Sequence, residues 1–113
     1  MVKYSAPDRG DVIWLDFTPQ AGREQGGRRP ALVLSPKAYH QKTGRAVVCP
    51  ITSQVKGYPF EVALPEGLAV GGVVLSDHVK NQDLAARNAA YACTVPESVL
   101  LDVTDLINEI INP

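Results

Sequence analysis

Metal-binding and disulfide-forming side chains are scarce in this sequence. It contains two cysteines, Cys49 and Cys93, and two histidines, His40 and His78, which are isolated from one another along the chain. Two cysteines are too few for a disulfide scaffold, and neither a C-x-x-C pair nor a histidine cluster has the spacing of a metal site. Cys49 belongs to the apolar run AVVCPI, which indicates a buried structural thiol rather than a catalytic one.

Long hydrophobic segments are also missing. No apolar run is long enough to span a bilayer, and the N-terminal residues MVKYSAPDRGD lack the hydrophobic region of a signal peptide. We therefore expect a cytoplasmic protein that does not enter a membrane. With 113 residues, of which 45% are hydrophobic, the chain should form one domain over residues 1–113, with a core small enough to gain stability from pairing.

An excess of positive charge is absent as well, since the formal net charge is −1, which by itself argues against a nucleic-acid-binding protein. The distribution of the charges is more informative. Between residues 23 and 56 the only acidic residue is Glu24, whereas the basic ones are Arg23, Arg28, Arg29, Lys37, Lys42, Arg45 and Lys56. From residue 96 to 113 acidic residues occur and basic ones do not. This bias predicts either a positive face on one part of the fold or scattered solvated side chains.

The apolar residues predict short strands joined by polar segments. Strands are expected at residues 10–17, 31–35, 46–52, 58–64 and 72–76, and a long glycine-rich loop at residues 18–30. A short helix fits between Ser35, as its N-cap, and Gly44, as its C-terminal stop. Residues 84–93 favour neither a strand nor a helix.

The C-terminal segment has the clearest helical pattern. Thr94 and Glu97 have the spacing of a capping box, and apolar residues then recur on one helical face. These residues are Val99, Leu100, Val103, Leu106, Ile107, Ile110 and Ile111. Dominant strands and one closing helix predict a mainly β fold with some α structure (α+β), in the form of a small, strongly bent sheet or half-open barrel with a C-terminal helix.

The loop GREQGGRRP at residues 22–30 has the most unusual composition in the chain. Glycine lets a backbone approach a ligand closely, and the planar guanidinium group of arginine matches the oxygens of a phosphate. Arg29 is the best-placed candidate, because Pro30 restricts its backbone and a predicted buried strand follows directly. The same composition also fits an ordinary mobile loop with solvated arginines.

A second polar cluster follows the third predicted strand and contains Thr52, Ser53 and Lys56. The two hydroxyl groups could end the strand in a turn, or they could bind phosphate and sugar oxygens while Lys56 adds charge. Phe17 lies where the first strand meets the glycine-rich loop, a position from which an aromatic ring could support a nucleotide base.

These side chains suit the cleavage of RNA. No Ser–His–Asp arrangement is apparent, but RNA supplies its own nucleophile in the 2′-hydroxyl group. A protein then needs to align that oxygen with the phosphorus, stabilise the charged transition state and handle protons. A guanidinium group does not release its proton readily enough to serve as an ordinary base, so Arg29 is assigned to transition-state charge and to proton donation to the leaving oxygen. Glu24 either acts as the base or orients Arg29.

Together these residues resemble the MazF toxins, the mRNA interferases of bacterial toxin–antitoxin pairs. The matching segments are GDVIWLDFTP (10–19), GREQGGRRPALVLSP (22–36), KTG (42–44), CPITSQ (49–54), KGYPFEV (56–62) and GVVLSDHVK (72–80). The combination of E-Q-x-G-x-R-P with P-x-T-[ST] is specific, whereas an R-P or T-S pair alone is not.

The resemblance implies a half-open barrel of the SH3-like type found in MazF and CcdB toxins, and a homodimer. It implies metal-independent endoribonuclease activity, without a cofactor, at short single-stranded RNA sequences, leaving a 2′,3′-cyclic phosphate and a 5′-hydroxyl. It ties catalysis to Arg29 and Thr52, and it places Glu24 and Gln25 near the RNA backbone. Candidate RNA contacts are Asp16, Phe17, Gln25, Arg28, Ser53, Lys56 and His78. The implied partner is a dimeric antitoxin whose acidic, disordered tail lies in the RNA groove.

The chain also departs from the family pattern. His78 stands where family members often have glutamine, and DLAAR at residues 83–87 lacks the tryptophan of the best-known relatives. These differences bear on RNA sequence choice and antitoxin pairing. Two other functions fit the same fold, namely a toxin that binds a protein target such as gyrase and an inactive relative that binds only RNA or antitoxin. The E-Q-x-G-x-R-P loop argues against the first, and the intact Arg29 and Thr52 argue against the second.

Overall fold

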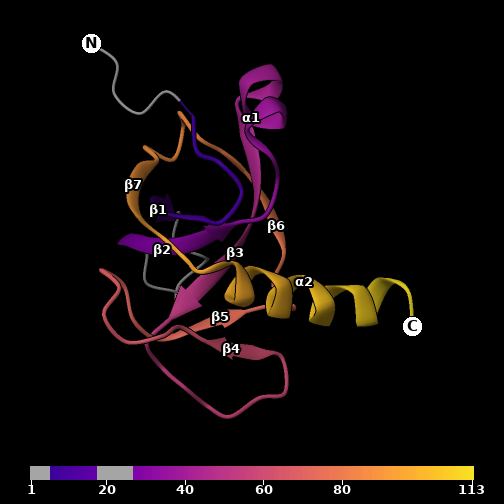
Figure 1. Ribbon diagram of the computed structural model, residues 1–113. Coiled ribbons are helices and arrows are strands. Elements are labelled where there is room, and N and C mark those ends of the chain that lie inside the picture. Colours follow the sequence, from indigo (N-terminus) through magenta and orange to yellow (C-terminus); the bar gives the residue numbers. More distant parts are fainter. Residues whose placement is uncertain (1–5, 18–26) are drawn as a thin grey trace, which may run out of the picture.

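The computed structural model describes residues 6–17 and 27–113 of the chain (Figure 1). Its elements are β1 (Asp11–Phe17), β2 (Gly27–Val33), α1 (Lys37–Thr43), β3 (Arg45–Thr52), β4 (Glu61–Ala63), β5 (Val73–Leu75), β6 (Lys80–Asp83), β7 (Ala90–Thr94) and α2 (Glu97–Ile111). Within these residues the strands form one antiparallel sheet in the order β4-β5-β3-β2-β1-β7, with β6 also paired to β3. The sheet is not closed. The predicted mainly β fold, half-open and with a C-terminal helix, is confirmed.

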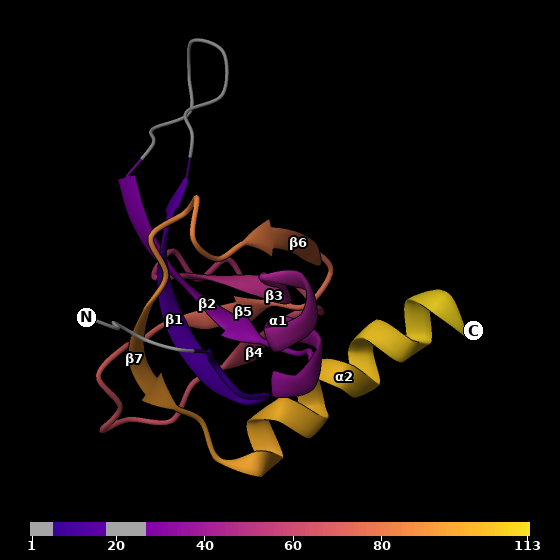
Figure 2. The same ribbon diagram turned by 90° about the horizontal axis from the view of Figure 1, so that it is seen from above.

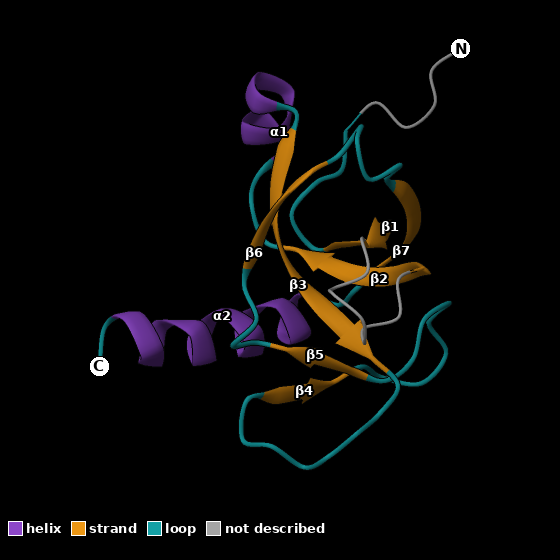
Figure 3. Ribbon diagram, turned by 180° about the vertical axis from the view of Figure 1, so that it is seen from behind, coloured by secondary structure: helices purple, strands orange, loops and turns teal. Residues whose placement is uncertain are grey.

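Strand β3 joins the two parts of the sheet. Along one edge its first half pairs with β6, and its last residues, Ile51 and Thr52, pair with β5. Along its other edge it pairs with β2. A strand that has two different partners on one edge bends between them, and this bend gives the curved sheet that is visible from behind (Figure 3).

Both faces of the central strands are buried. Because successive side chains of a strand point to opposite faces, the apolar residues of β1, β2 and β3 divide between two cores. One core lies beneath α2 and includes Val12, Leu32 and Cys49. The other core, on the opposite face, consists of Ile13, Leu15, Ala31, Val33, Ala46 and Val48. The two cores hold the β2–β3 pair rigidly from both sides.

Helix α2 packs on the sheet through its first half. Val99, Leu100 and Val103 are buried, whereas Ile110 and Ile111 are exposed, and the last turns extend past the strands (Figure 2). The predicted amphipathic helix is confirmed, but its apolar face is longer than the surface it covers within this chain. Neither of the two helices in the described residues is long and apolar enough to cross a bilayer.

Several predicted strand boundaries were wrong. Strand β2 begins at Gly27 rather than at residue 31, because Arg28 and Arg29 already pair with β1. The last part of the predicted 18–30 loop is therefore strand. Strands β4 and β5 are shorter than the predicted 58–64 and 72–76. The undecided residues 84–93 contain a turn and most of β7, and β6 was missed because its sequence, KNQD, is polar throughout.

Both predicted N-terminal helix caps were also wrong. Pro36 and Pro96 occupy the N-cap positions, and neither helix start has a side-chain cap. The hydroxyl group of Thr94 donates instead to the carboxylate of Asp11 at 3.0 Å. The predicted stop of α1 is confirmed, since Gly44 has a φ of 72° and donates its N–H to the carbonyl oxygen of His40 at 2.8 Å.

A buried chain of hydrogen bonds anchors α1 through His40, which is 3% exposed. Its Nδ1 atom lies 2.8 Å from the carbonyl oxygen of Pro7, which can only accept, so Nδ1 carries a proton. In the neutral ring Nε2 then accepts from the hydroxyl group of Ser35 at 2.7 Å. The Oγ atom of Ser35 accepts the N–H of Val47 at 2.8 Å. Ser35 thus joins the network instead of capping the helix.

The two cysteines should differ sharply in reactivity. Burial raises the pKa of the Cys49 thiol to about 12, whereas Cys93 is partly exposed. We predict that iodoacetamide at a pH of about 8 modifies Cys93 and spares Cys49 in the native protein, as read by mass spectrometry, because only a thiolate reacts. Fast modification of native Cys49 would contradict this prediction, and both cysteines should react in guanidinium chloride.

The raised pKa of Cys49 also gives a sign for the pH dependence of stability. The folded thiol ionises at a higher pH than the unfolded one, whose ordinary pKa is 9.0. Ionisation therefore favours the unfolded chain. Below pH 9.0 the Cys49 thiol does not change the free energy of unfolding, and as the pH rises from there toward about 12 it lowers that free energy.

Candidate active site

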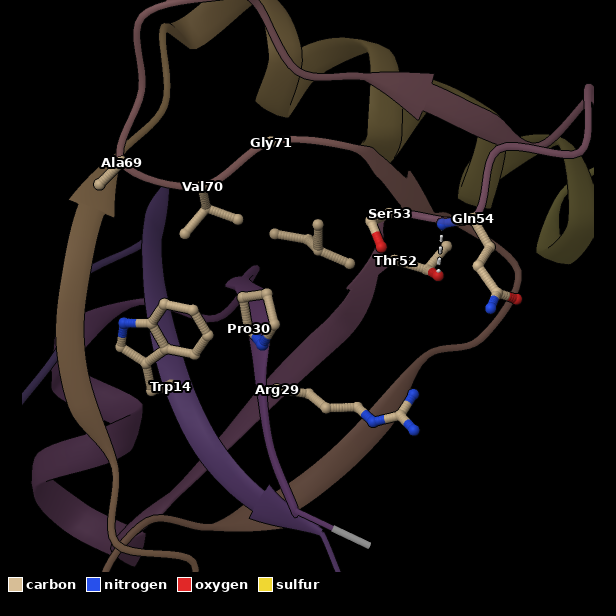
Figure 4. Close-up of a pocket in the computed structure, with 10 residues that line it drawn as sticks. Trp14, Arg29, Pro30, Thr52, Ser53, Gln54, Ala69, Val70 and Gly71 are labelled. Carbon is tan, nitrogen blue, oxygen red and sulfur yellow. Dashed lines mark hydrogen bonds between the residues drawn. The ribbon is translucent and has the colours of Figure 1, made fainter. Parts of the chain in front are cut away.

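A pocket of about 510 Å³ lies where β2 and β3 meet the segment that precedes β5 (Figure 4). Its lining residues come from four parts of the chain and are Trp14, Arg29, Pro30, Ile51, Thr52, Ser53, Gln54, Ala69, Val70 and Gly71. Three of the predicted site residues, Arg29, Thr52 and Ser53, therefore line one pocket.

Strand register brings Arg29 and Thr52 together. Strand β2 pairs with β3 so that Ala31 lies opposite Pro50, and continuing this register by two residues places Arg29 level with Thr52. On its other side β2 is fixed by β1, where Leu15 lies opposite Arg29. The side chain of Arg29 extends toward the end of the pocket that holds Thr52, Ser53 and Gln54 (Figure 4). A guanidinium group and a hydroxyl group thus face the same space.

The hydroxyl group of Thr52 is oriented by the turn that follows β3. Its Oγ1 atom accepts the backbone N–H of Gln54 at 3.1 Å (Figure 4). This bond occupies one lone pair and leaves the hydroxyl hydrogen as a donor toward the pocket. Thr52 is half-buried at the end of a strand that is paired on both edges, which holds its backbone more firmly than a loop would.

The pocket has two chemically different parts. Arg29, Thr52, Ser53 and Gln54 supply charge and hydrogen-bonding groups at one end, and such groups can bind a phosphate. The remaining wall is mostly apolar and consists of Trp14, Pro30, Ile51, Ala69, Val70 and Gly71. Such a combination is typical of small-molecule and nucleotide sites, in which apolar surface gives contact and a few polar groups fix orientation.

Asp16 and Arg28 bind each other and the turn before β7. The guanidinium group of Arg28 donates to Asp16 at 2.8 Å and to the carbonyl oxygen of Asn88 at 2.6 Å. The amide of Asn88 donates to the second carboxylate oxygen of Asp16 at 2.7 Å. Hydrogen bonds from Asn88 and then Arg28 hold the pKa of Asp16 below its ordinary value. The ionised carboxylate therefore ties this turn to the ends of β1 and β2.

Phe17 and Lys80 form a second pair near the same strand ends. The ring of Phe17 packs partly against the second core, and the Nζ atom of Lys80 lies 5.8 Å from its centroid. This distance permits a cation–π contact. Phe17 is thus held against the sheet next to a positive charge, an arrangement that suits a platform for a base.

The other predicted site residues lie away from the pocket or outside the described residues. Glu24 and Gln25 lie outside the described residues. Lys56 is exposed, and its backbone N–H donates to Glu61 at 3.1 Å. His78 is exposed in the turn after β5, with Nε2 3.7 Å from Asp77. Neither Lys56 nor His78 lines the pocket, so their assignment as RNA contacts stays a prediction.

Sequence patterns missed part of the site. Trp14 lines the pocket and does not lie wholly in the core. Because side chains alternate along β1, Trp14 points to the opposite face from its neighbours Ile13 and Leu15, so this part of its placement could be read from the sequence. Asn88 has a φ of 54°, the left-handed conformation that asparagine tolerates, but nothing in the local sequence points to its bond with Asp16. Ala69 and Val70 also line the pocket, and no local sequence pattern marks them as site residues.

Fold and pocket together define a small, mainly β protein whose half-open sheet carries a pocket with one polar, positively charged end. The sequence matches the family described as PemK-like, MazF-like toxin of type II toxin–antitoxin system over residues 8–111. It is 48% identical over 111 residues to the endoribonuclease toxin MazF of Escherichia coli (strain K12), covering 98% of this chain and 99% of that protein. It is 32% identical to the endoribonuclease PemK of Escherichia coli, covering 92% of this chain and 81% of that one.

Solved structures agree with this match. A crystal structure of MazE–MazF from Deinococcus radiodurans contains a chain that is 52% identical, with a TM-score of 0.89, and the likeness covers 96% of this chain and 97% of that chain. The chain belongs to the family of PemK-like, MazF-like toxins of type II toxin–antitoxin systems.

Proposed function

We propose that this chain is an endoribonuclease toxin that cleaves single-stranded RNA at specific short sequences without a metal ion. The observation that carries the proposal is the presence of Arg29 and Thr52 in one pocket, with the guanidinium group directed toward the hydroxyl end. A relative named as an endoribonuclease toxin, similar to this chain over nearly its whole length, supports the proposal. Cleavage by attack of the RNA's own 2′-hydroxyl group requires no other nucleophile.

The placement of Arg29 and Thr52 in one pocket supports the following reaction. The 2′-oxygen attacks the adjacent phosphorus, a new P–O2′ bond forms and the P–O5′ bond breaks, leaving a 2′,3′-cyclic phosphate and a 5′-hydroxyl. Arg29 binds the phosphate oxygens, stabilises their added negative charge and donates a proton to the leaving 5′-oxygen. Thr52 donates a hydrogen bond to the phosphate. Glu24 takes the proton of the 2′-hydroxyl group, or it orients Arg29 and that proton passes to water.

The RNA contacts that we propose extend beyond the pocket itself. We assign phosphate and sugar contacts to Gln25, Arg28, Ser53, Lys56 and His78, and a base platform to Phe17. Asp16 orients Arg28 through their 2.8 Å ion pair. The whole chain of residues 1–113 acts as one domain, in the cytoplasm, where its RNA substrate lies.

Two protein partners complete the proposal. The first is a second copy of the chain, and the second is a cognate antitoxin. Solved relatives in MazE–MazF structures support an antitoxin partner. An acidic, disordered antitoxin tail would neutralise the basic bias of residues 23–56 and occupy the RNA groove.

The direct test is cleavage of a long single-stranded RNA in excess EDTA, followed by sequencing and chemical analysis of the cut ends. Discrete cuts with 2′,3′-cyclic phosphates are expected. A short RNA containing one deoxynucleotide on the 5′ side of the cut should resist cleavage, because it lacks the nucleophile. Intact RNA after incubation with folded protein would contradict the proposal and favour a protein-binding toxin or an inactive relative.

A further inference from the structure

Gly72, the residue before β5, lies directly against the backbone of Thr52 and Ser53. A β-carbon on Gly72 would lie 2.2 Å from the carbonyl oxygen of Thr52, 2.9 Å from its carbonyl carbon and 3.1 Å from the α-carbon of Ser53. These are backbone atoms, so no side chain can rotate away to make room. Gly72 also has a φ of +113°, where any other residue is strained. A side chain fits here only if Thr52 moves.

The surrounding hydrogen bonds prevent Gly72 itself from moving away easily. Its carbonyl oxygen accepts the N–H of Leu64 at 3.0 Å. The next residue, Val73, pairs with Thr52 on one side and with Ala63 on the other. Gly72 is therefore fixed between β4 and the end of β3, and its contact with Thr52 is part of the sheet rather than of a free loop.

We propose that Gly72 is a positioning residue for RNA cleavage, because the missing side chain lets β5 begin against Thr52 and so sets where the Thr52 hydroxyl group meets the phosphate. This inference rests on the proposed function. A displacement of about 1 Å at a reacting group can lower a rate about 100-fold. Gly72 does not line the pocket, so its replacement should lower kcat while RNA binding stays nearly unchanged.

The first experiment compares Gly72→Ala with Gly67→Ala. Gly67 has a similar φ of +96°, but a β-carbon there would meet no atom within 4 Å, so its replacement reproduces the backbone strain without the contact. We expect Gly72→Ala to lower kcat about 100-fold, with binding of a deoxy-substituted RNA within about two-fold of wild type. Gly67→Ala should cleave at the wild-type rate. Equal kcat values for the two variants would overturn the inference.

A double-mutant cycle shows whether Gly72 acts through Thr52. In a Thr52→Ala background, adding Gly72→Ala should lower kcat by less than about three-fold, because the group it misplaces is already absent. Fully additive losses would overturn the inference and leave the proposed function intact. A Thr52→Ala variant with the wild-type rate would instead contradict the proposed role of Thr52.

Thermal unfolding monitored by circular dichroism accompanies each variant. If Gly72→Ala is unfolded at the assay temperature, all four proteins of the cycle are measured at a lower temperature at which circular dichroism shows each of them folded. The same outcomes then support or overturn the inference.

Discussion

An Arg29→Ala variant is expected to cleave RNA about 1,000-fold more slowly than the wild-type protein while keeping its fold, which corresponds to about 4 kcal/mol of transition-state stabilisation. Arg29 lies on the exposed end of β2, so its side chain contributes little to either core. Its loss leaves the developing charge on the phosphate without a bidentate donor. Single arginines and oxyanion donors in comparable roles contribute factors of about 10² to 10⁵.

Two further variants separate geometry from charge. Arg29→Lys keeps the positive charge but loses the planar fork, so it should recover only part of the rate. Arg45→Ala removes a charge at the other end of β3, where Arg45 is bound to Asn81, and should cleave at the wild-type rate. Single-turnover rates at saturating protein separate cleavage from binding. An Arg29→Ala rate within about ten-fold of wild type would mean that other groups stabilise the transition state.

The largest loss of stability is expected for His40→Leu. Leucine fills the buried space but leaves the carbonyl oxygen of Pro7 without its donor and the hydroxyl group of Ser35 without its acceptor. Buried polar groups that lose their partners cost about 1 to 3 kcal/mol each, so the loss of two partners should lower the free energy of unfolding by about 2 to 6 kcal/mol. Urea denaturation, with the slope compared between variants, measures this change.

Tyr39→Phe is the matched control on the same helix. It keeps the ring that contacts the edge of His40 and removes only the hydroxyl group that accepts from Asn81 at 2.8 Å. Because this bond is exposed, its loss should cost less than about 1 kcal/mol. If His40→Leu is no less stable than Tyr39→Phe, the buried network does not anchor α1 as described.

Sequence patterns predicted the central strands and α2 because burial imposes a period on them. Strands β1 and β3 and the buried half of β2 alternate between two cores, and the apolar residues of α2 recur at helical spacing. Strand β6 escaped prediction, since it is polar throughout and is held by its pairing with β3. Edge pairing depends on the neighbouring strand and leaves little trace in the local sequence.

The candidate site was predictable only in part. Arg29 and Thr52 could be named from motifs, but their meeting depends on the β2–β3 register, which spacing along the chain does not reveal. Asn88 joins Asp16 across 72 positions of the chain. The role of Gly72 depends on a backbone contact with Thr52, and many glycines in the sequence have no comparable contact. Contacts of this kind arise from the fold.

The two halves of the pocket are joined to different neighbouring strands. At the end of β3, Ile51 and Thr52 pair with β5, whereas Arg28 and Arg29 at the start of β2 pair with β1. The pairing of β2 with β3 itself runs from Ala31 to Val33 and from Val48 to Pro50. Local opening at either outer pairing therefore separates Arg29 from Thr52 while the ladder between β2 and β3 is still intact, and amide exchange at these two residues should report the two openings independently.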